Sequence, residues 1–224
     1  LVEENSRRDR RSQEYELIDT GVFEEDRYFD VLVEYAKGGV EDILVKISAI
    51  NRGPETAHLH LLPTLWFRNT WSWNGREAKP ILSKLINSRL TAVTITHPVM
   101  GKRRLYCDGS PELLFTENET NCRRLYHAEN NSRFTKDGIN DYIVNGIREA
   151  VNPDQFGTKM AASYPMSIKP GESATVRLRL TLPNFAVSEG ALLKKDFDRI
   201  FVLRQQEAEE FYKTITPADL SSDA

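Results

Sequence analysis

Cysteine is scarce in this sequence of 224 residues, in which only Cys107 and Cys122 occur. Two cysteines in a chain of this length do not form the disulfide framework of a small secreted protein. No CxxC pair is present for zinc binding or redox chemistry. We therefore expect reduced thiols and a cytoplasmic protein.

Long apolar runs and an excess of charge of one sign are also lacking. No run approaches the roughly 20 apolar residues that a membrane-spanning helix needs. The 30 basic and 33 acidic residues nearly cancel, which leaves a formal net charge of −3. No basic block provides an electrostatic footprint for nucleic acid or an anionic membrane. We expect neither of these two partners.

The familiar motifs of nucleophilic, nucleotide and metal sites are absent as well. The sequence has no GxSxG, no P-loop and no GxGxxG after a strand. His58 and His60 alternate along one expected strand and could bind a metal together. A third ligand is lacking, because His97 and His127 belong to unrelated segments. We expect no metal and no cofactor.

What the sequence does contain is a series of short runs in which apolar and polar residues alternate, typical of half-buried strands. Strands are expected at 28–37, 43–49, 59–67, 90–96, 113–117, 142–147, 159–168 and 175–182. In the last of these, leucines and Val176 are expected to face the core, whereas Arg177, Arg179 and Thr181 face water. Repeated amphipathic strands with turn signals between them predict a mainly β fold, an antiparallel β-sandwich.

The period changes to that of a helix near Asp196. The apolar residues at helical spacing are Phe197, Ile200, Phe201, Ala208, Phe211 and Ile215. Pro217 is expected to end this amphipathic helix. Its apolar stripe needs a partner surface. That surface is either a second domain to which the helix leads or the chain's own sandwich, and periodicity does not decide between them.

All three tryptophans lie within eight residues, at Trp66, Trp71 and Trp73, together with Arg68 and Asn69. Indole faces stack on sugar rings or on a neighbouring domain, and Arg and Asn supply directed hydrogen bonds. The segment therefore fits a sugar-binding surface or a domain interface. The alternative is that the tryptophans close one end of a β core.

The carboxylates that could form an acid–base pair are Glu117, Glu119 and Asp137. Glycoside hydrolysis needs two carboxyl groups about 5 to 10 Å apart on either side of the scissile bond. Charged residues at strand ends are, however, usually solvated or cap turns. We therefore expect no catalytic pair within this chain.

Three strings carry a resemblance to a known family. They are ELIDTGVF at 16–23 followed by YFDV at 28–31, LPTLWFRNTWSW at 62–73, and LFTENETN at 114–121. With these strings the chain resembles large bacterial proteins similar to glycoside hydrolase family 63. That family includes processing α-glucosidases that act on mannosyl-oligosaccharides. The resemblance extends from about Leu1 to Ile215.

The resemblance implies an N-terminal antiparallel β-sandwich of the super-sandwich type that precedes a catalytic (α/α)6 barrel. The implied division is a polar lead-in at 1–15, the sandwich at 16–190, a helix at 191–216 that leads to the barrel, and a linker tail at 217–224. The carboxylates of such enzymes lie on the barrel, so no catalytic residue transfers to this chain. The partners implied are the barrel of the same polypeptide and an oligosaccharide substrate.

On this interpretation the chain is a non-catalytic domain of an α-glucosidase-like hydrolase, inactive alone. The expected substrate or interdomain surface consists of Trp66, Arg68, Asn69, Trp71, Trp73, Glu117, Asn118 and Glu119. Two alternatives remain open. One is an autonomous carbohydrate-binding module, which needs exposed tryptophans. The other is a complete enzyme whose carboxylates are among Glu117, Glu119 and Asp137.

Overall fold

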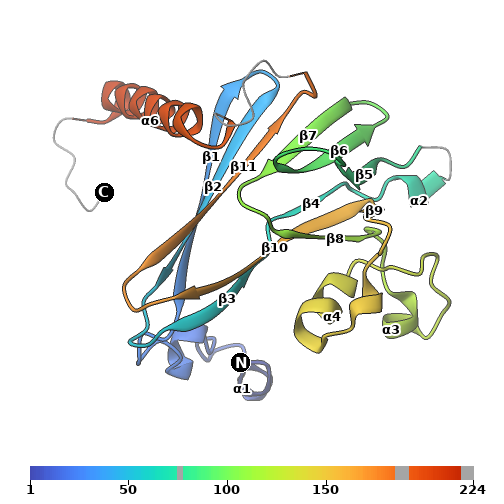
Figure 1. Ribbon diagram of the computed structural model, residues 1–224. Helices are drawn as coiled ribbons and strands as arrows, with labels where there is room; N and C mark the ends of the chain where they lie inside the picture. Colours follow the sequence, from blue (N-terminus) through green and yellow to red (C-terminus); the bar gives the residue numbers. More distant parts are fainter. Residues whose placement is uncertain (75–77, 185–191, 218–224) are drawn as a thin grey trace. The chain divides into compact units, whose positions relative to one another are not determined.

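The computed structural model describes residues 1–74, 78–184 and 192–217. Within them the chain forms two antiparallel sheets (Figure 1). The seven-stranded sheet has the order β1-β2-β11-β7-β6-β5-β9, and the second sheet has the order β3-β10-β4 with β8 also paired to β10. The predicted fold class, mainly β with antiparallel sheets and a C-terminal helix, is confirmed.

The strands are β1 (Phe29–Gly39), β2 (Asp42–Asn51), β3 (Ala57–Leu61), β4 (Thr64–Trp66), β5 (Ile81–Lys84), β6 (Thr91–His97), β7 (Gly101–Cys107), β8 (Glu112–Thr116), β9 (Phe156–Gly157), β10 (Lys159–Ile168) and β11 (Ser173–Thr181). The helices are α1 (Val2–Arg7), α2 (Trp71–Asn74), α3 (Cys122–Tyr126), α4 (Gly138–Asn145) and α6 (Lys195–Ile215). Short 3-10 turns occupy Leu17–Thr20 and Arg148–Ala150. No helix of the described residues is long and apolar enough to cross a membrane.

The chain divides into two compact units. The first comprises 1–33, 47–60 and 165–175, and the second comprises 34–46, 61–164 and 176–224. In the first unit, buried Asn51 links separate segments. Its Nδ2 donates to the carbonyls of Ile168 at 2.8 Å and Glu55 at 2.7 Å, and its Oδ1 accepts from the Gly53 amide at 2.9 Å. The expected surface residues all belong to the second unit.

Two runs of antiparallel pairing organise the second unit. The hairpin β6–β7 pairs Thr91 with Cys107 and closes at His97 and Gly101. Strand β10 lies between β8 and β4, so that Ala161 is opposite both Leu114 and Thr64. This pairing brings the end of β4, which carries the tryptophan segment, close to the end of β8, which carries the acidic string.

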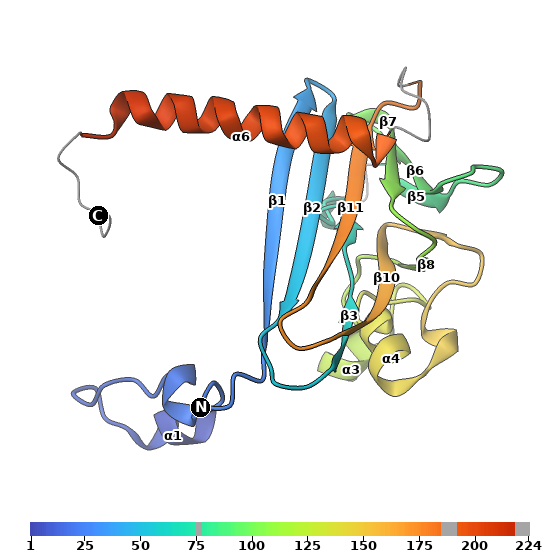
Figure 2. The same ribbon diagram turned by 60° about the vertical axis from the view of Figure 1, so that its left-hand side comes forward.

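Helix α6 packs on the seven-stranded sheet through its N-terminal part. Phe197 is fully buried and Ile200 nearly so, in a cluster with residues of the sheet that include Ala36, Leu44 and Tyr106. Figure 2 shows the helix crossing β11, β2 and β1 and continuing beyond β1. From Val202 to Ile215 the side chains are exposed. The beginning of the apolar stripe thus packs on the chain's own sheet.

The predicted strand at 142–147 is wrong, because this segment belongs largely to helix α4. Ile139, Tyr142 and Ile143 are spaced by one helical turn and pack against Leu114 and Ala161 of the sheet. Periodicity cannot separate a short apolar run in a strand from one in a helix, and here tertiary packing decides for the helix.

The face assignment of the last strand is wrong at its C-terminal end. Arg179 and Thr181 were expected to face water but are 1% and 0% exposed, whereas Leu182 is 39% exposed. The physical reason is that α6 covers the second face of this strand, so both faces are buried. Arg179 is accommodated there because it pairs with Asp42 and Asp196.

Candidate functional site

The three tryptophans occupy three different environments. Trp66 ends β4 and is 54% exposed, Trp71 begins the one-turn helix α2 and is 7% exposed, and Trp73 in the same turn is 62% exposed. An Asn-Gly dipeptide predicts a turn, and the turn so predicted at Asn74-Gly75 falls partly outside the described residues. The interpretation as core therefore suits Trp71, whereas Trp66 and Trp73 are available for contact.

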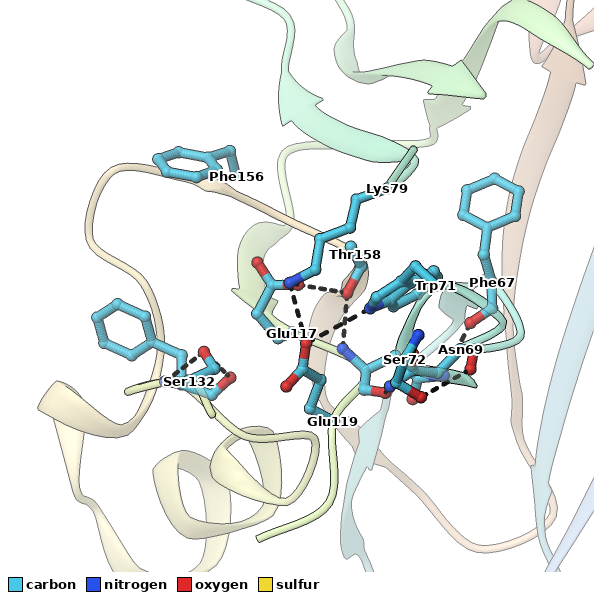
Figure 3. Close-up of polar contacts among 12 residues, drawn as sticks. Phe67, Asn69, Trp71, Ser72, Lys79, Glu117, Glu119, Ser132, Phe156 and Thr158 are labelled. Atoms are coloured by element: carbon cyan, nitrogen blue, oxygen red, sulfur yellow. Dashed lines mark hydrogen bonds and ion pairs between the residues drawn. The ribbon is translucent and has the colours of Figure 1, made fainter. Parts of the chain in front are cut away.

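A hydrogen-bonded network joins the tryptophan segment to the acidic string (Figure 3). Glu119 accepts hydrogen bonds from Trp71 Nε1 at 3.4 Å and from Lys79 Nζ at 2.9 Å. Glu117 accepts from Lys79 Nζ at 3.5 Å and from Thr158 Oγ1 at 2.7 Å. One ammonium group therefore bridges both carboxylates, which come from the segment just after β8.

The charge of Lys79 is secured by this arrangement. Burial works to lower the pKa of Lys79, but the hydrogen bond to Glu119 and the charges of Glu117 and Glu119 outweigh it and raise the pKa. The ammonium therefore stays protonated and compensates the carboxylates of the buried Glu119 and the half-buried Glu117. The hydrogen bonds that Glu119 accepts from Trp71 and Glu117 accepts from Thr158 hold these two side chains in place.

The two asparagines of the expected surface act on the backbone. Asn118 Nδ2 donates to the Phe67 carbonyl at 2.8 Å, and Asn69 Nδ2 donates to the Asn118 carbonyl at 3.2 Å. The Asn69 Oδ1 accepts from the Ser72 amide at 3.2 Å, which starts the turn of α2. The structure thus brings Asn69 and Asn118 together as links between the segments after β4 and β8.

The exposed part of the site is an Arg–Trp pair beside a small pocket. The guanidinium of Arg68 lies 4.8 Å from the centre of the Trp73 ring. A pocket of about 240 Å³ is lined by Arg68, Trp71, His97 and Val99, among other residues. Trp66 lies outside this lining and is paired with Lys159 across β4 and β10. The expected surface therefore separates into an exposed pair, a buried network and a tryptophan on the strand.

Asp137, the third candidate carboxylate, lies outside the Lys79 network and caps local structure. It accepts hydrogen bonds from Thr135 Oγ1 at 2.7 Å, Asn121 Nδ2 at 3.0 Å and Arg124 Nη1 at 3.2 Å. Partial burial works to raise the pKa of Asp137, but these donors outweigh it and hold the pKa below its ordinary value. An acid catalyst requires a raised pKa, so this environment does not favour that role.

The pH dependence of stability tests the structural role of Asp137. Because the folded pKa is lowered, its stabilisation is present above the ordinary aspartate pKa of about 3.9 and is lost as the pH falls through the folded value. Asp137→Asn is expected to lower the free energy of unfolding at neutral pH by about 1–2 kcal/mol. In urea titrations the difference from wild type should shrink as the pH falls below the ordinary aspartate pKa and through the lower folded value. The exposed Asp154→Asn serves as a control, and equal effects of the two variants at neutral pH would contradict the assignment.

The histidines and cysteines do not assemble a further site. His58 and His60 are both exposed on β3. In the ranges that the structure describes, no group of three His, Cys, Asp or Glu residues could hold a metal ion. Both cysteines are free thiols. Burial raises the pKa of Cys107 to about 12, which leaves it protonated and unreactive at neutral pH.

Sequence reasoning missed Lys79 and Thr158, which complete the network. They lie about 40 residues from their partners in the chain. The only signal was indirect, since two acidic residues two positions apart at the end of an apolar strand need a cation when they are buried. Nothing in the local sequence of Lys79 identifies it as that cation.

A comparison with curated proteins relates the chain to a longer yeast protein. No family model matches the chain. The uncharacterized protein YMR196W of Saccharomyces cerevisiae is 32% identical over 262 residues, a match that includes the whole chain and 24% of the yeast protein. The chain therefore spans about a quarter of the length of the curated relative that it matches.

Proposed function

We propose that this chain is a non-catalytic β-sandwich domain of a larger glycoside-hydrolase-like protein, in which it supports a catalytic (α/α)6 barrel of the same polypeptide. The observation that carries the proposal is the state of its carboxylates. Glu117 and Glu119 share the ammonium of Lys79, and Glu119 also holds the indole of Trp71. An acid–base pair for glycoside hydrolysis would instead need carboxyl groups that are open to substrate.

The exposed Arg68–Trp73 pair supports a contact role for the same surface. Arginine and tryptophan are among the residues enriched where protein surfaces meet, and both also pack against sugars. The pair lies beside a pocket that Arg68 helps to line. The length of the yeast relative supports a setting in which further domains are present to meet this surface.

The main alternative, an autonomous carbohydrate-binding module, is favoured by the exposure of Trp66 and Trp73. A stacking platform needs ring faces that are free for the sugar. Trp71 is buried, and Arg68 lies over the Trp73 ring. A sugar would therefore have to displace the guanidinium or bind the opposite ring face.

Tryptophan fluorescence distinguishes the two functions, because all three indoles lie in the segment in question. We expect no saturable change when the chain is titrated with glucose- or mannose-containing oligosaccharides. We expect a saturable blue shift with the barrel region of the longer protein, since docking removes Trp73 from water. Trp73→Phe should abolish most of that shift, whereas the matched variant Trp66→Phe should retain it. Saturation by sugar alone would contradict the proposal and favour the binding module.

A further inference from the structure

The apolar stripe of α6 continues beyond the surface on which the helix packs. At 100° per residue, Ala208, Phe211 and Ile215 fall on the same side of the helix as the buried Phe197. Phe211 is 59% exposed and Ile215 is 60% exposed. The side of the helix that faces the sheet at its beginning therefore carries uncovered aromatic and aliphatic residues at its end.

Contacts along α6 show where the seven-stranded sheet beneath the helix ends. Arg177 of β11 lies over the Phe197 ring at 5.8 Å, and Lys46 of the next strand, β2, lies over Phe201 at 4.8 Å. Four helical residues advance about 6 Å, which is close to the strand spacing of about 4.8 Å. The following turn reaches β1, the last strand of this sheet, and the helix continues beyond it (Figure 2). The remaining residues up to Ile215 advance about 15 Å, which corresponds to about three strand spacings.

Strand β1 is itself an open edge with apolar side chains. It is 11 residues long and ends the order of its sheet. On one face Val31, Val33 and Tyr35 are 48%, 43% and 72% exposed. Natural edge strands are usually protected by proline, by several charges or by shortness. This strand is long and has no proline, and of its three charged residues Asp30 pairs with Arg52 and Glu34 pairs with Lys46. Such an edge is a template for pairing with another strand.

We propose that a second copy of this chain covers both features, with β1 of the two copies paired antiparallel and each α6 extending over the partner's sheet. The two features are complementary to each other: the helix overhangs the place where the added strands would lie. A two-fold axis satisfies both at once, because each copy offers one open edge and one overhanging helix. This dimer goes beyond the proposed function and does not depend on it.

The side chains of β1 fit a register in which the two-fold axis lies at Val33. With the two-fold axis at Val33, this residue lies opposite its own copy, and Val31 lies opposite Tyr35 of the partner subunit. Aromatic and β-branched cross-strand pairs of this kind are favourable. Moving the axis by one residue would place Glu34 opposite either Asp30 or Glu34 of the partner subunit, and like charges directly opposite are destabilising.

The mass of the protein in solution tests the dimer. Wild type is expected at twice the chain mass of 25.7 kDa by light scattering. Val33→Lys places two ammonium groups at the axis and is expected to halve the mass. Val144→Lys introduces the same change at a site on α4 that is 71% exposed, and it should remain dimeric. A monomeric wild type, or a dimeric Val33→Lys, would overturn the proposal.

Mixing charge variants tests the position of the axis. Val33→Lys and Val33→Glu should each be monomeric alone and should form a heterodimer when mixed, since opposite charges then meet at the axis. Two monomeric variants that do not associate on mixing would overturn the register.

Phe211→Glu tests the contribution of the helix, and it should weaken the dimer by placing a charge on the overhanging end of α6. Circular dichroism shows whether Val33→Lys is folded. If it is unfolded, Phe211→Glu and Tyr35→Lys replace it as the test of the dimer. Dimers as tight as wild type in both of these variants would reject the proposal.

Discussion

Replacing Arg179 with leucine is expected to lower the free energy of unfolding by about 3–5 kcal/mol. Arg179 Nε and Nη2 donate to the two carboxylate oxygens of Asp42 at 2.8 and 2.7 Å, and Nη1 donates to Asp196 at 2.9 Å. The side chains of Arg179 and Asp42 are 1% and 4% exposed. Leucine would leave the Asp42 carboxylate buried without its cation, and an uncompensated buried charge is strongly destabilising.

The neighbouring Arg177 provides a matched control for this prediction. It stands two residues earlier on the same strand and pairs with Asp198 at 3.0 Å, but the Asp198 side chain is 55% exposed. Arg177→Leu is therefore expected to cost less than about 1 kcal/mol. Urea unfolding of the two variants at neutral pH makes the comparison. Equal losses of unfolding free energy in the two variants would show that burial does not make the Arg179–Asp42 pair more important for stability than the exposed Arg177–Asp198 pair.

A double variant separates the pair from the loss of packing. In Asp42→Leu/Arg179→Leu both buried charges are removed, and stability should recover a large part of what the single variant loses. The single variant Asp42→Leu should lose as much stability as Arg179→Leu, because it leaves the Arg179 guanidinium buried without its bidentate carboxylate partner. A double variant that is less stable than either single variant would contradict this electrostatic explanation.

Replacing Trp71 with alanine is expected to lower the free energy of unfolding by about 3–5 kcal/mol, the range for a buried tryptophan. Trp71 is 7% exposed, and its Nε1 donates to Glu119, so the variant leaves both a cavity and a lost hydrogen bond. Trp73→Ala, two residues away in the same turn and 62% exposed, should change stability by only about 0.5 kcal/mol. Thermal and urea unfolding provide the measurement.

The effects of Trp73→Ala and Trp71→Ala on docking should have the opposite order to their effects on stability. Trp73→Ala removes the ring over which Arg68 lies and is expected to weaken docking of the barrel region while the domain stays folded. Trp71→Ala should affect docking only as far as it unfolds the domain. If Trp71→Ala were as stable as wild type, the network around Glu119 would have to be assigned to ligand binding instead of structure.

The strands whose side chains have one consistent environment could be predicted from the sequence. The run at 159–168 matches β10 at both ends, and those at 90–96 and 113–117 match β6 and β8 within one residue. Alternation succeeds there because a strand in a sheet repeats every two residues. The C-terminal helix was likewise evident from its 3.6-residue period, and it begins at Lys195.

The errors arose where tertiary contacts override local pattern. Arg179 alternates with leucines as a solvent-facing residue would, and only the distant Asp42 and Asp196 make its burial possible. The segment at 142–147 has the residues of a strand, but its spacing fits the surface formed by Leu114 and Ala161. Within the tryptophan segment, composition predicted an interaction surface, and no local signal separated the buried Trp71 from the exposed Trp73.

Because α6 is held only near its N-terminus, a small change of its tilt there produces a larger displacement at its C-terminus. Its first turn is held by the Arg179–Asp196 pair and by Phe197 in the core, while the 14 residues from Val202 to Ile215 project without burial. These residues extend about 21 Å, so a tilt of about 5° at the anchored end displaces the far end by about 2 Å. Substitutions around Asp42, far from the end of the helix in sequence, would therefore shift the exposed Phe211 and Ile215.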